Sequence, residues 1–323
     1  MTSPETDTQR PFVRYSWLLL AYVTAVILWG AYVRASGSGA GCGSHWPLCN
    51  GEIVPRHPSA KTLIELGHRI TSGLSAVGVL IQLLWSRRLF ARGSSTRRWA
   101  AYGAALMILE VMIGAGIVLL EYVDMNASVG RAIWMVVHLV NTFMLVGALT
   151  LTAHVAGGGK PPRFRLDDWR ALMGLAALAG TLFVGASGAV AALGDTLFPA
   201  QHLRTALAAD LSATAHLLVR LRLVHPFAAV FVGGFLLVVR MLLAGSSASR
   251  DAQRWGMCLR VSVLAQLALG LVNVMLLAPI WMQLVHLFMA DVVWISLVMM
   301  LAYRLGEEDV VVEADGATHE DEL

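Results

Sequence analysis

Charged residues are scarce in this chain of 323 residues. Asp, Glu, Lys and Arg make up only 14%, whereas hydrophobic residues make up 57% and the mean hydropathy is +0.66. Soluble domains carry about a quarter charged residues, so the composition excludes most soluble folds. Three cysteines are too few for a disulfide scaffold. The net charge of +3 does not indicate a nucleic-acid partner, because the basic residues cluster between apolar runs.

Long hydrophobic runs take the place of the missing charge. A helix needs about 20 apolar residues to cross a hydrocarbon core about 30 Å thick. The sequence therefore predicts an all-α integral membrane protein with eight transmembrane helices. These cover residues 15–36, 64–85, 99–120, 132–155, 170–193, 223–244, 257–278 and 281–303.

The distribution of Lys and Arg predicts how these spans are oriented. Basic residues concentrate in the connections 86–98, 156–169 and 245–256, and the positive-inside rule assigns such loops to the cytoplasm. Both termini then lie on the cytoplasmic side, and 156–169 is a cytoplasmic linker. We expect 1–14 to be a cytoplasmic tail and 304–323, which is rich in Asp and Glu, to be a disordered, solvated one.

The two halves of the chain repeat a pattern of histidines. His68 in the second span matches His225 in the sixth, and His138 in the fourth matches His286 in the eighth. Because corresponding positions are four spans apart, the repeat keeps its orientation, which predicts two parallel, pseudo-symmetric four-helix bundles. These bundles cover residues 15–155 and 170–303.

The third and seventh spans repeat a weaker pattern. The third has Glu110 four residues before Gly114, and the seventh has Gln266 four residues before Gly270. This match supports the internal repeat.

The four span histidines lie near the outer start of their helices, at one depth. Two imidazoles on facing helices can hold a haem iron from both sides. A zinc site usually has three or four protein ligands, whereas each half offers two. The pattern indicates one haem site in each half, and hydrogen bonding between helices is the alternative for any single histidine.

Haem propionates need cationic partners near the water interface, and six arginines lie on the outer side. Snorkelling to lipid phosphate is the alternative role for each of them. They are Arg34, Arg69, Arg131, Arg204, Arg220 and Arg222.

Glu65 is a candidate for the chemistry. It precedes His68 by three residues, so both side chains share one helical face. A carboxylate near a membrane core is costly and indicates function, and orienting the histidine is the alternative role. The second half has Arg222 at the corresponding position, which indicates that one site reacts and the other assists.

The outer loop between the first two spans is rich in glycine and contains Cys42 and Cys49. Thiols on that side can be oxidised, so a disulfide is compatible with the spacing, as a structural clip, a redox-active pair or a site of transient thiol attachment. We expect Cys258 to be a buried apolar filler. The remaining histidines are expected mostly at the surface, with two able to cover the second haem (His202 and His216). They are His45, His57, His154, His202, His216 and His319.

Taken in order, these residues resemble the haem A synthase family of bacterial and mitochondrial membranes. The resemblance covers nearly all of residues 12–305. Its most specific elements are Cys42 to Cys49 with Trp46-Pro47-Leu48, Glu65-x-x-His68-Arg69, Gly194-Asp195-x-x-Phe198-Pro199, His138, His225 and His286.

The resemblance implies oxidation of the C8 methyl group of haem O to a formyl group by successive hydroxylations, which gives haem A for cytochrome oxidase. It makes the N-terminal bundle the substrate-haem half, with His68 and His138 as iron ligands and Glu65 as the catalytic carboxylate. The C-terminal bundle would hold haem b as cofactor on His225 and His286. The cysteine pair of many bacterial members has a structural or haem-transfer role.

One position departs from the family pattern. Many members carry an arginine after the sixth-span histidine, whereas Pro226 follows His225 here. Proline is tolerated in the first helical turn, so the ligand is retained. Propionate pairing must then fall to Arg220, Arg222 or another group.

The resemblance also implies a bacterial inner (plasma) membrane location with the haem sites toward the outer face. Expected partners are haem O, the lipid bilayer, a haem O synthase, cytochrome oxidase assembly factors and an electron donor. A homo-oligomer is compatible with the sequence. The alternative function is a quinone-linked, transmembrane di-haem b electron carrier without haem-modifying activity, although such carriers usually hold their haems toward opposite faces.

Overall fold

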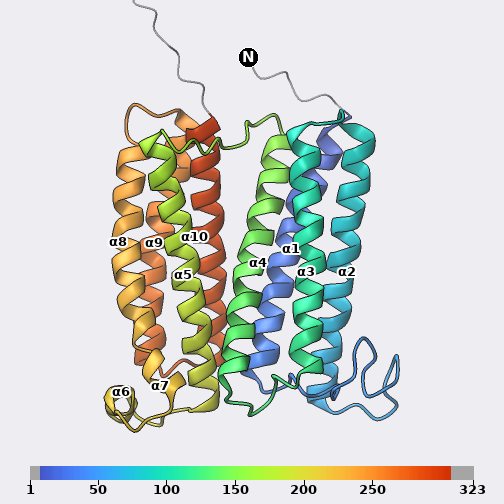
Figure 1. Ribbon diagram of the computed structural model, residues 1–323, viewed down its shortest axis with the longest axis vertical. Helices are drawn as coiled ribbons and strands as arrows, with labels where there is room; N and C mark the ends of the chain where they lie inside the picture. The colour runs from blue at the N-terminus through green and yellow to red at the C-terminus, as the bar shows by residue number, and fades with distance from the viewer. Residues whose placement is uncertain (1–7, 307–323) are drawn as a thin grey trace, which may run out of the picture.

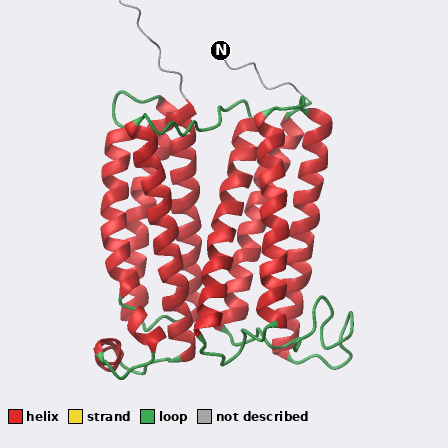
Figure 2. Ribbon diagram, viewed as in Figure 1, coloured by secondary structure: helices red, strands yellow, loops and turns green. Residues whose placement is uncertain are grey.

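The computed structural model describes residues 8–306, which fold into ten helices joined by loops (Figures 1 and 2). Eight candidate membrane spans lie among them, and each predicted span coincides with one. They are α1 (Arg10–Ala35), α2 (Ala60–Leu89), α3 (Ser95–Leu119), α4 (Val129–Ala156), α5 (Trp169–Leu197), α8 (Val224–Leu243), α9 (Arg250–Met275) and α10 (Ile280–Gly306).

Polar caps explain why the helices are longer than the apolar runs. Four helices begin after a serine whose side-chain oxygen accepts a hydrogen bond from a backbone N–H of the first turn, and α5 begins in the same way after Asp168. Such caps satisfy N–H groups that have no partner within the helix. The helix ends therefore extend past the hydrocarbon run. The capping serines are Ser59, Ser94, Ser128 and Ser249.

Large apolar side chains on the outer surface fit a multi-pass membrane protein. Leu18, Ile81, Phe231 and Met241 are among those exposed in the isolated chain. On a soluble protein, an exposed apolar surface of this extent would mark a contact with lipid or with another protein. On eight apolar helices that are long enough to cross a membrane, this surface fits contact with lipid tails.

Two short helices, α6 (Leu203–Leu211) and α7 (Leu217–Leu221), were not predicted. They occupy the connection between α5 and α8, and α7 leads directly into the sixth span. Pro226 lies in the first turn of α8, as expected for a proline that leaves the helix intact. His225 is therefore part of that helix.

Figure 1 shows two groups of spans side by side. The N-terminal group contains α1 to α4, and the C-terminal group contains α5, α8, α9 and α10. The connection between α1 and α2 lies at the same end as α6 and α7, opposite the end where α1 begins and α10 stops. The starts of α2, α4, α8 and α10, and hence the four span histidines, are therefore at that shared end.

A buried aromatic stack joins the two groups. The Trp294 ring of α10 lies against the Phe143 ring of α4, with ring centroids 5.5 Å apart and planes 15° apart. The indole Nε1 of Trp294 donates a hydrogen bond of 2.6 Å to the Phe143 carbonyl. Gly147 makes room for the indole, since an added Cβ would lie 3.3 Å from Nε1.

Arg34 joins the groups a second time. From α1 its guanidinium donates to the Ala192 carbonyl (2.7 Å) and the Thr196 hydroxyl (2.6 Å) of α5. It also donates to Gln283 Oε1 of α10 at 2.8 Å. These three bonds run between elements far apart in sequence, so they fix how the groups meet.

Two expectations differ from the structure. Cys258 is exposed rather than buried, because it lies off the α9 face that buries Leu259 and Val263. His154 is buried, with its ring edge-on to Tyr303. Residues 1–7 and 307–323, and with them His319, lie outside the described residues.

We expect Arg34→Ala to destabilise the protein by about 2 kcal/mol, because it leaves three partly buried acceptors without their charged donor. Thermal unfolding in detergent measures the change. Arg254→Ala is the control, since that side chain is 76% exposed and its ion pair with Asp251 is worth little. Equal melting temperatures for the two variants would contradict the role given to Arg34.

Candidate functional site

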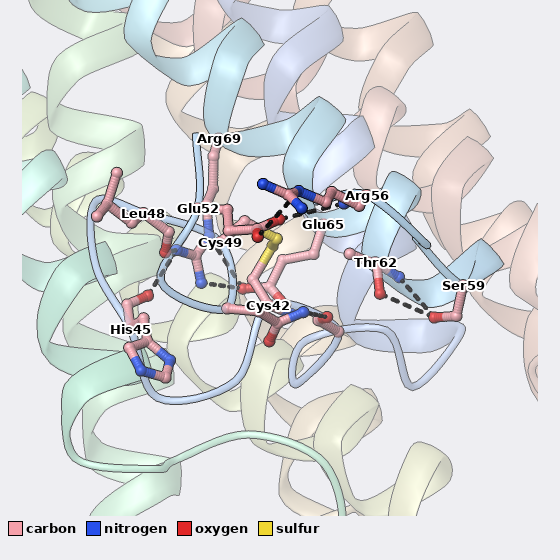
Figure 3. The surroundings of a disulfide bond; sticks show 12 residues. Cys42, His45, Leu48, Cys49, Glu52, Arg56, Ser59, Thr62, Glu65 and Arg69 are labelled. Carbon is pink, nitrogen blue, oxygen red and sulfur yellow. Dashed lines mark hydrogen bonds and ion pairs between the residues drawn. A yellow bond between two sulfur atoms is a disulfide. The ribbon is translucent and has the colours of Figure 1, made fainter. Parts of the chain in front are cut away.

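A disulfide closes the loop between α1 and α2 in the N-terminal group (Figure 3). Cys42 and Cys49 are bonded and buried, which confirms the pairing that the spacing allowed. Gly41 lets the loop press against the start of α2, because a Cβ there would collide with the Lys61 carbonyl. The loop is thus held against the helix that carries Glu65 and His68.

Glu65 and Arg69 connect this loop to α2 (Figure 3). Glu65 is only 3% exposed; its Oε2 accepts from the Cys42 N–H at 2.8 Å, and its Oε1 accepts from Arg69 Nη2 at 2.5 Å. Arg69 Nη1 donates to the carbonyls of His45 (2.7 Å) and Leu48 (2.9 Å). The carboxylate therefore has one fixed position, set jointly by the loop and by Arg69.

Glycines make room for the span histidines. An added Cβ on Gly30 of α1 would lie 2.8 Å from His68 Cε1, and one on Gly188 of α5 would lie 2.9 Å from His225 Cε1. Both distances are shorter than real Cβ contacts, so each imidazole fills space that only a glycine leaves. The two glycine–histidine pairs occupy matching places, α1 with α2 and α5 with α8.

His225 and His286 face each other in the C-terminal group. Their ring centroids are 6.2 Å apart and their planes are 88° apart. The Nδ1 atom of His225 lies 3.2 Å from both the Val184 carbonyl and the Ser187 hydroxyl, which leaves its Nε2 free of those contacts. His286 fits against Gly270, whose added Cβ would lie 3.1 Å from Cε1.

The N-terminal pair has buried ring nitrogens that the protein does not use. Nδ1 of His68 and Nδ1 of His138 have no hydrogen-bond partner among the described residues, and the same holds for Nδ1 of His286. Buried polar groups without partners are rare, so these imidazoles fit a ligand such as a haem iron.

A carboxylate adjoins His138. Glu110 of α3 accepts hydrogen bonds from Asn141 Nδ2 (2.6 Å) and Thr142 Oγ1 (2.5 Å), and its Oε1 lies 3.4 Å from His138 Nδ1. That last distance is an electrostatic contact rather than a hydrogen bond. In the C-terminal group, Gln266 approaches His286 instead, with Nε2 atoms 3.2 Å apart.

Asp291 is a polar residue that the sequence analysis missed. It is fully buried in α10, and neither carboxylate oxygen has a hydrogen-bond partner within residues 8–306. The sequence signal that could have identified Asp291 is an acidic residue inside the predicted span 281–303. An ionisable group there is expensive to bury and indicates function.

The arginines expected at the propionates have different surroundings. Arg34 and Arg69 already donate to the groups described above. Arg131 is 4% exposed and donates to the carbonyls of Asp124 (2.6 Å) and Asn126 (2.9 Å), while its Nε is buried without a partner in the described part of the chain.

Arg222 has two carboxylates as partners, Asp195 at 3.0 Å and Asp210 at 2.8 Å. Arg204 and Arg220 are exposed. The structure thus does not bring the six arginines together, and Arg222, which stands where Glu65 stands in the first half, is part of an ion-pair network.

An all-helical, multi-pass membrane protein with paired histidines at one end is the class that this fold and site define. A profile of the COX15-CtaA family, described as "Cytochrome oxidase assembly protein", matches residues 13–298. Since this range is most of the chain, the protein belongs to that family. The family resemblance read from the motifs is confirmed.

Relatives carry two kinds of name. The "Protoheme IX farnesyltransferase" of Thermus thermophilus is 45% identical over 262 residues, 81% of this chain and 43% of that protein. A "Heme A synthase" of Geobacillus kaustophilus is 42% identical over 93 residues, 29% of each chain. One of Alkalihalophilus pseudofirmus is 38% identical over 104 residues, 32% of this chain and 35% of that protein. The chain thus spans less than half the length of these relatives.

Replacing Cys42 and Cys49 together by alanine is expected to cost about 2–3 kcal/mol, because the disulfide closes a short loop with a sequence separation of 7. Thermal unfolding in detergent should show the loss, and reductant should bring the native chain to the same melting temperature. Cys258→Ala, which removes an exposed free thiol, is the control and should change nothing. Equal melting temperatures for the double variant and this control would contradict a stabilising role for the disulfide.

Proposed function

We propose that the protein is a haem A synthase, an oxidoreductase that converts the C8 methyl group of haem O to a formyl group by successive hydroxylations. The observation that carries the proposal is the buried Glu65 fixed beside His68 in a chain with two histidine pairs. Family membership and the relatives named heme A synthase support it.

The N-terminal group is proposed as the substrate site. His68 and His138 would hold the iron of haem O, and the buried Nδ1 of His68, which has no hydrogen-bond partner among the described residues, and the space beside Gly30 support this role. His225 and His286 would hold haem b as the cofactor in the C-terminal group. Haem b supplies electron transfer when bound.

The residues around Glu65 orient the reacting group. Arg69 and the Cys42 N–H hold the carboxylate in one position, so it marks a fixed point next to the bound substrate. The disulfide loop covers this end of the group and limits the access of water. Selecting one methyl group among several requires such a rigid frame, because a small misplacement lowers the rate steeply.

Differences between the groups support one reactive site. Arg222 stands where Glu65 stands in the first half and is bound by Asp195 and Asp210. That environment offers no carboxylate fixed by a disulfide loop. We therefore assign the oxidation to the N-terminal group and the assisting role to the C-terminal group.

The same proposal covers topology and partners. The two groups would be parallel, pseudo-symmetric bundles, 15–155 and 170–303, with both termini cytoplasmic and the haem sites toward the outer face of a bacterial plasma membrane. A disulfide at the end that carries the site fits the oxidising, outer side of the membrane.

Haem O synthase is the proposed source of substrate, and one relative bears the name of a protoheme IX farnesyltransferase. Cytochrome oxidase assembly factors and an electron donor complete the partners.

Glu65→Gln is expected to keep haem binding but to lower formyl formation at least tenfold. The substitution removes the negative charge of the carboxylate and keeps the shape of the side chain. Chromatography of haems extracted from membranes that express the variant measures the product. Glu52→Gln is the matched control, because Glu52 lies in the loop that contacts Glu65 and its side chain pairs with exposed Arg56. Normal haem A with Glu65→Gln would remove Glu65 from the chemistry.

His225→Ala should abolish the signal of haem b in a reduced-minus-oxidised spectrum of the purified protein, because it deletes one axial ligand. His57→Ala, at an exposed position in the loop between α1 and α2, should leave the spectrum unchanged. An unaltered spectrum with His225→Ala would refute that ligand. If both pairs bind only haem b and no haem O is converted, the electron carrier explains the protein better.

A further inference from the structure

The environments of the two proposed ligands on α4 and α10 differ in charge. Glu110 approaches His138 with a carboxylate, whereas Gln266 approaches His286 with a neutral amide. Both come from the preceding span, α3 and α9, at matching places of the repeat. The ring nitrogens differ, since Glu110 Oε1 lies 3.4 Å from Nδ1 of His138, whereas Gln266 Nε2 lies 3.2 Å from Nε2 of His286.

Further contacts hold Glu110 in place. Asn141 donates to one carboxylate oxygen and Thr142 to the other, so the side chain cannot turn away from His138 without losing two hydrogen bonds. At the corresponding positions of α10 stand Met289 and Ala290, which offer no such donors. The network therefore belongs to the N-terminal group alone.

We propose that Glu110 is a positioning residue that orients His138 and makes it the more electron-donating ligand, so that the two haem sites differ in reduction potential. This inference rests on the proposed function. A carboxylate that contacts a ligating imidazole fixes its orientation and raises its basicity, and a neutral amide does so less. A more basic ligand stabilises the oxidised iron, so the N-terminal site has the lower potential.

This asymmetry matters for the direction of electron flow. The protein uses the same ligand type four times, so imidazole alone gives the two sites no preference. Outer contacts of the ligands are one of the few means by which a protein changes a haem potential. Glu110 and Gln266 supply that difference within an otherwise repeated frame.

Reciprocal substitution tests the proposal. The full chain is co-expressed with a haem O synthase, purified with bound haem, and titrated by optical redox potentiometry as native protein, Glu110→Gln and Gln266→Glu. Glu110→Gln should raise the potential of the haem on His68 and His138 alone, by about tenfold in the reduction equilibrium, or ~59 mV for one electron. Gln266→Glu should lower that of the haem on His225 and His286 alone.

The outcomes separate this inference from the proposed function. Bound haem with unshifted potentials, or with both haems shifted together, overturns the role of Glu110 and leaves the synthase proposal standing. A native chain that binds no haem contradicts the proposed function itself. Should Glu110→Gln fail to fold, Gln266→Glu decides alone, because it adds a charge without removing a hydrogen-bond acceptor; an unshifted or raised potential then overturns the proposal.

Discussion

A polar group inside a lipid bilayer has to find its partner within the protein, and this constraint governs the whole structure. Arg34 is the clearest case, since its guanidinium reaches across to α5 and α10 and so joins the two groups of spans. Trp294 does the same with the Phe143 carbonyl. Among the described residues, the buried Nδ1 of His68 is one of the few polar groups that lack a hydrogen-bond partner, and it belongs to the proposed haem site.

The proposed site follows from small differences within a repeated frame. Gly30 and Gly188 leave equivalent space for histidines in both groups. Around that common frame, the first group adds a disulfide loop, the Glu65–Arg69 pair and the Glu110 network. In the function proposed above, the repeated features hold the two irons, and the features found only in the first group select the site of the chemistry.

The sequence alone predicted the spans well, because a helix that crosses the lipid needs a minimum number of consecutive apolar residues, and such runs are visible in the sequence. The roles of Glu65 and the four span histidines stay predictions, although all five residues lie in helices as expected. It missed α6 and the burial of His154, since short surface helices and helix-end packing leave no periodic signal. The long reach of Arg34 to Gln283 depends on how two groups of helices meet, which local patterns do not encode.

The central claim is that this chain makes haem A from haem O with carboxylate chemistry in its first four spans. The most direct measurement is co-expression with a haem O synthase in a host that lacks haem A, followed by chromatography of the extracted haems. We predict that haem A accumulates when this chain is present and is absent without it. Extracts that contain only haem O and haem b would contradict the account.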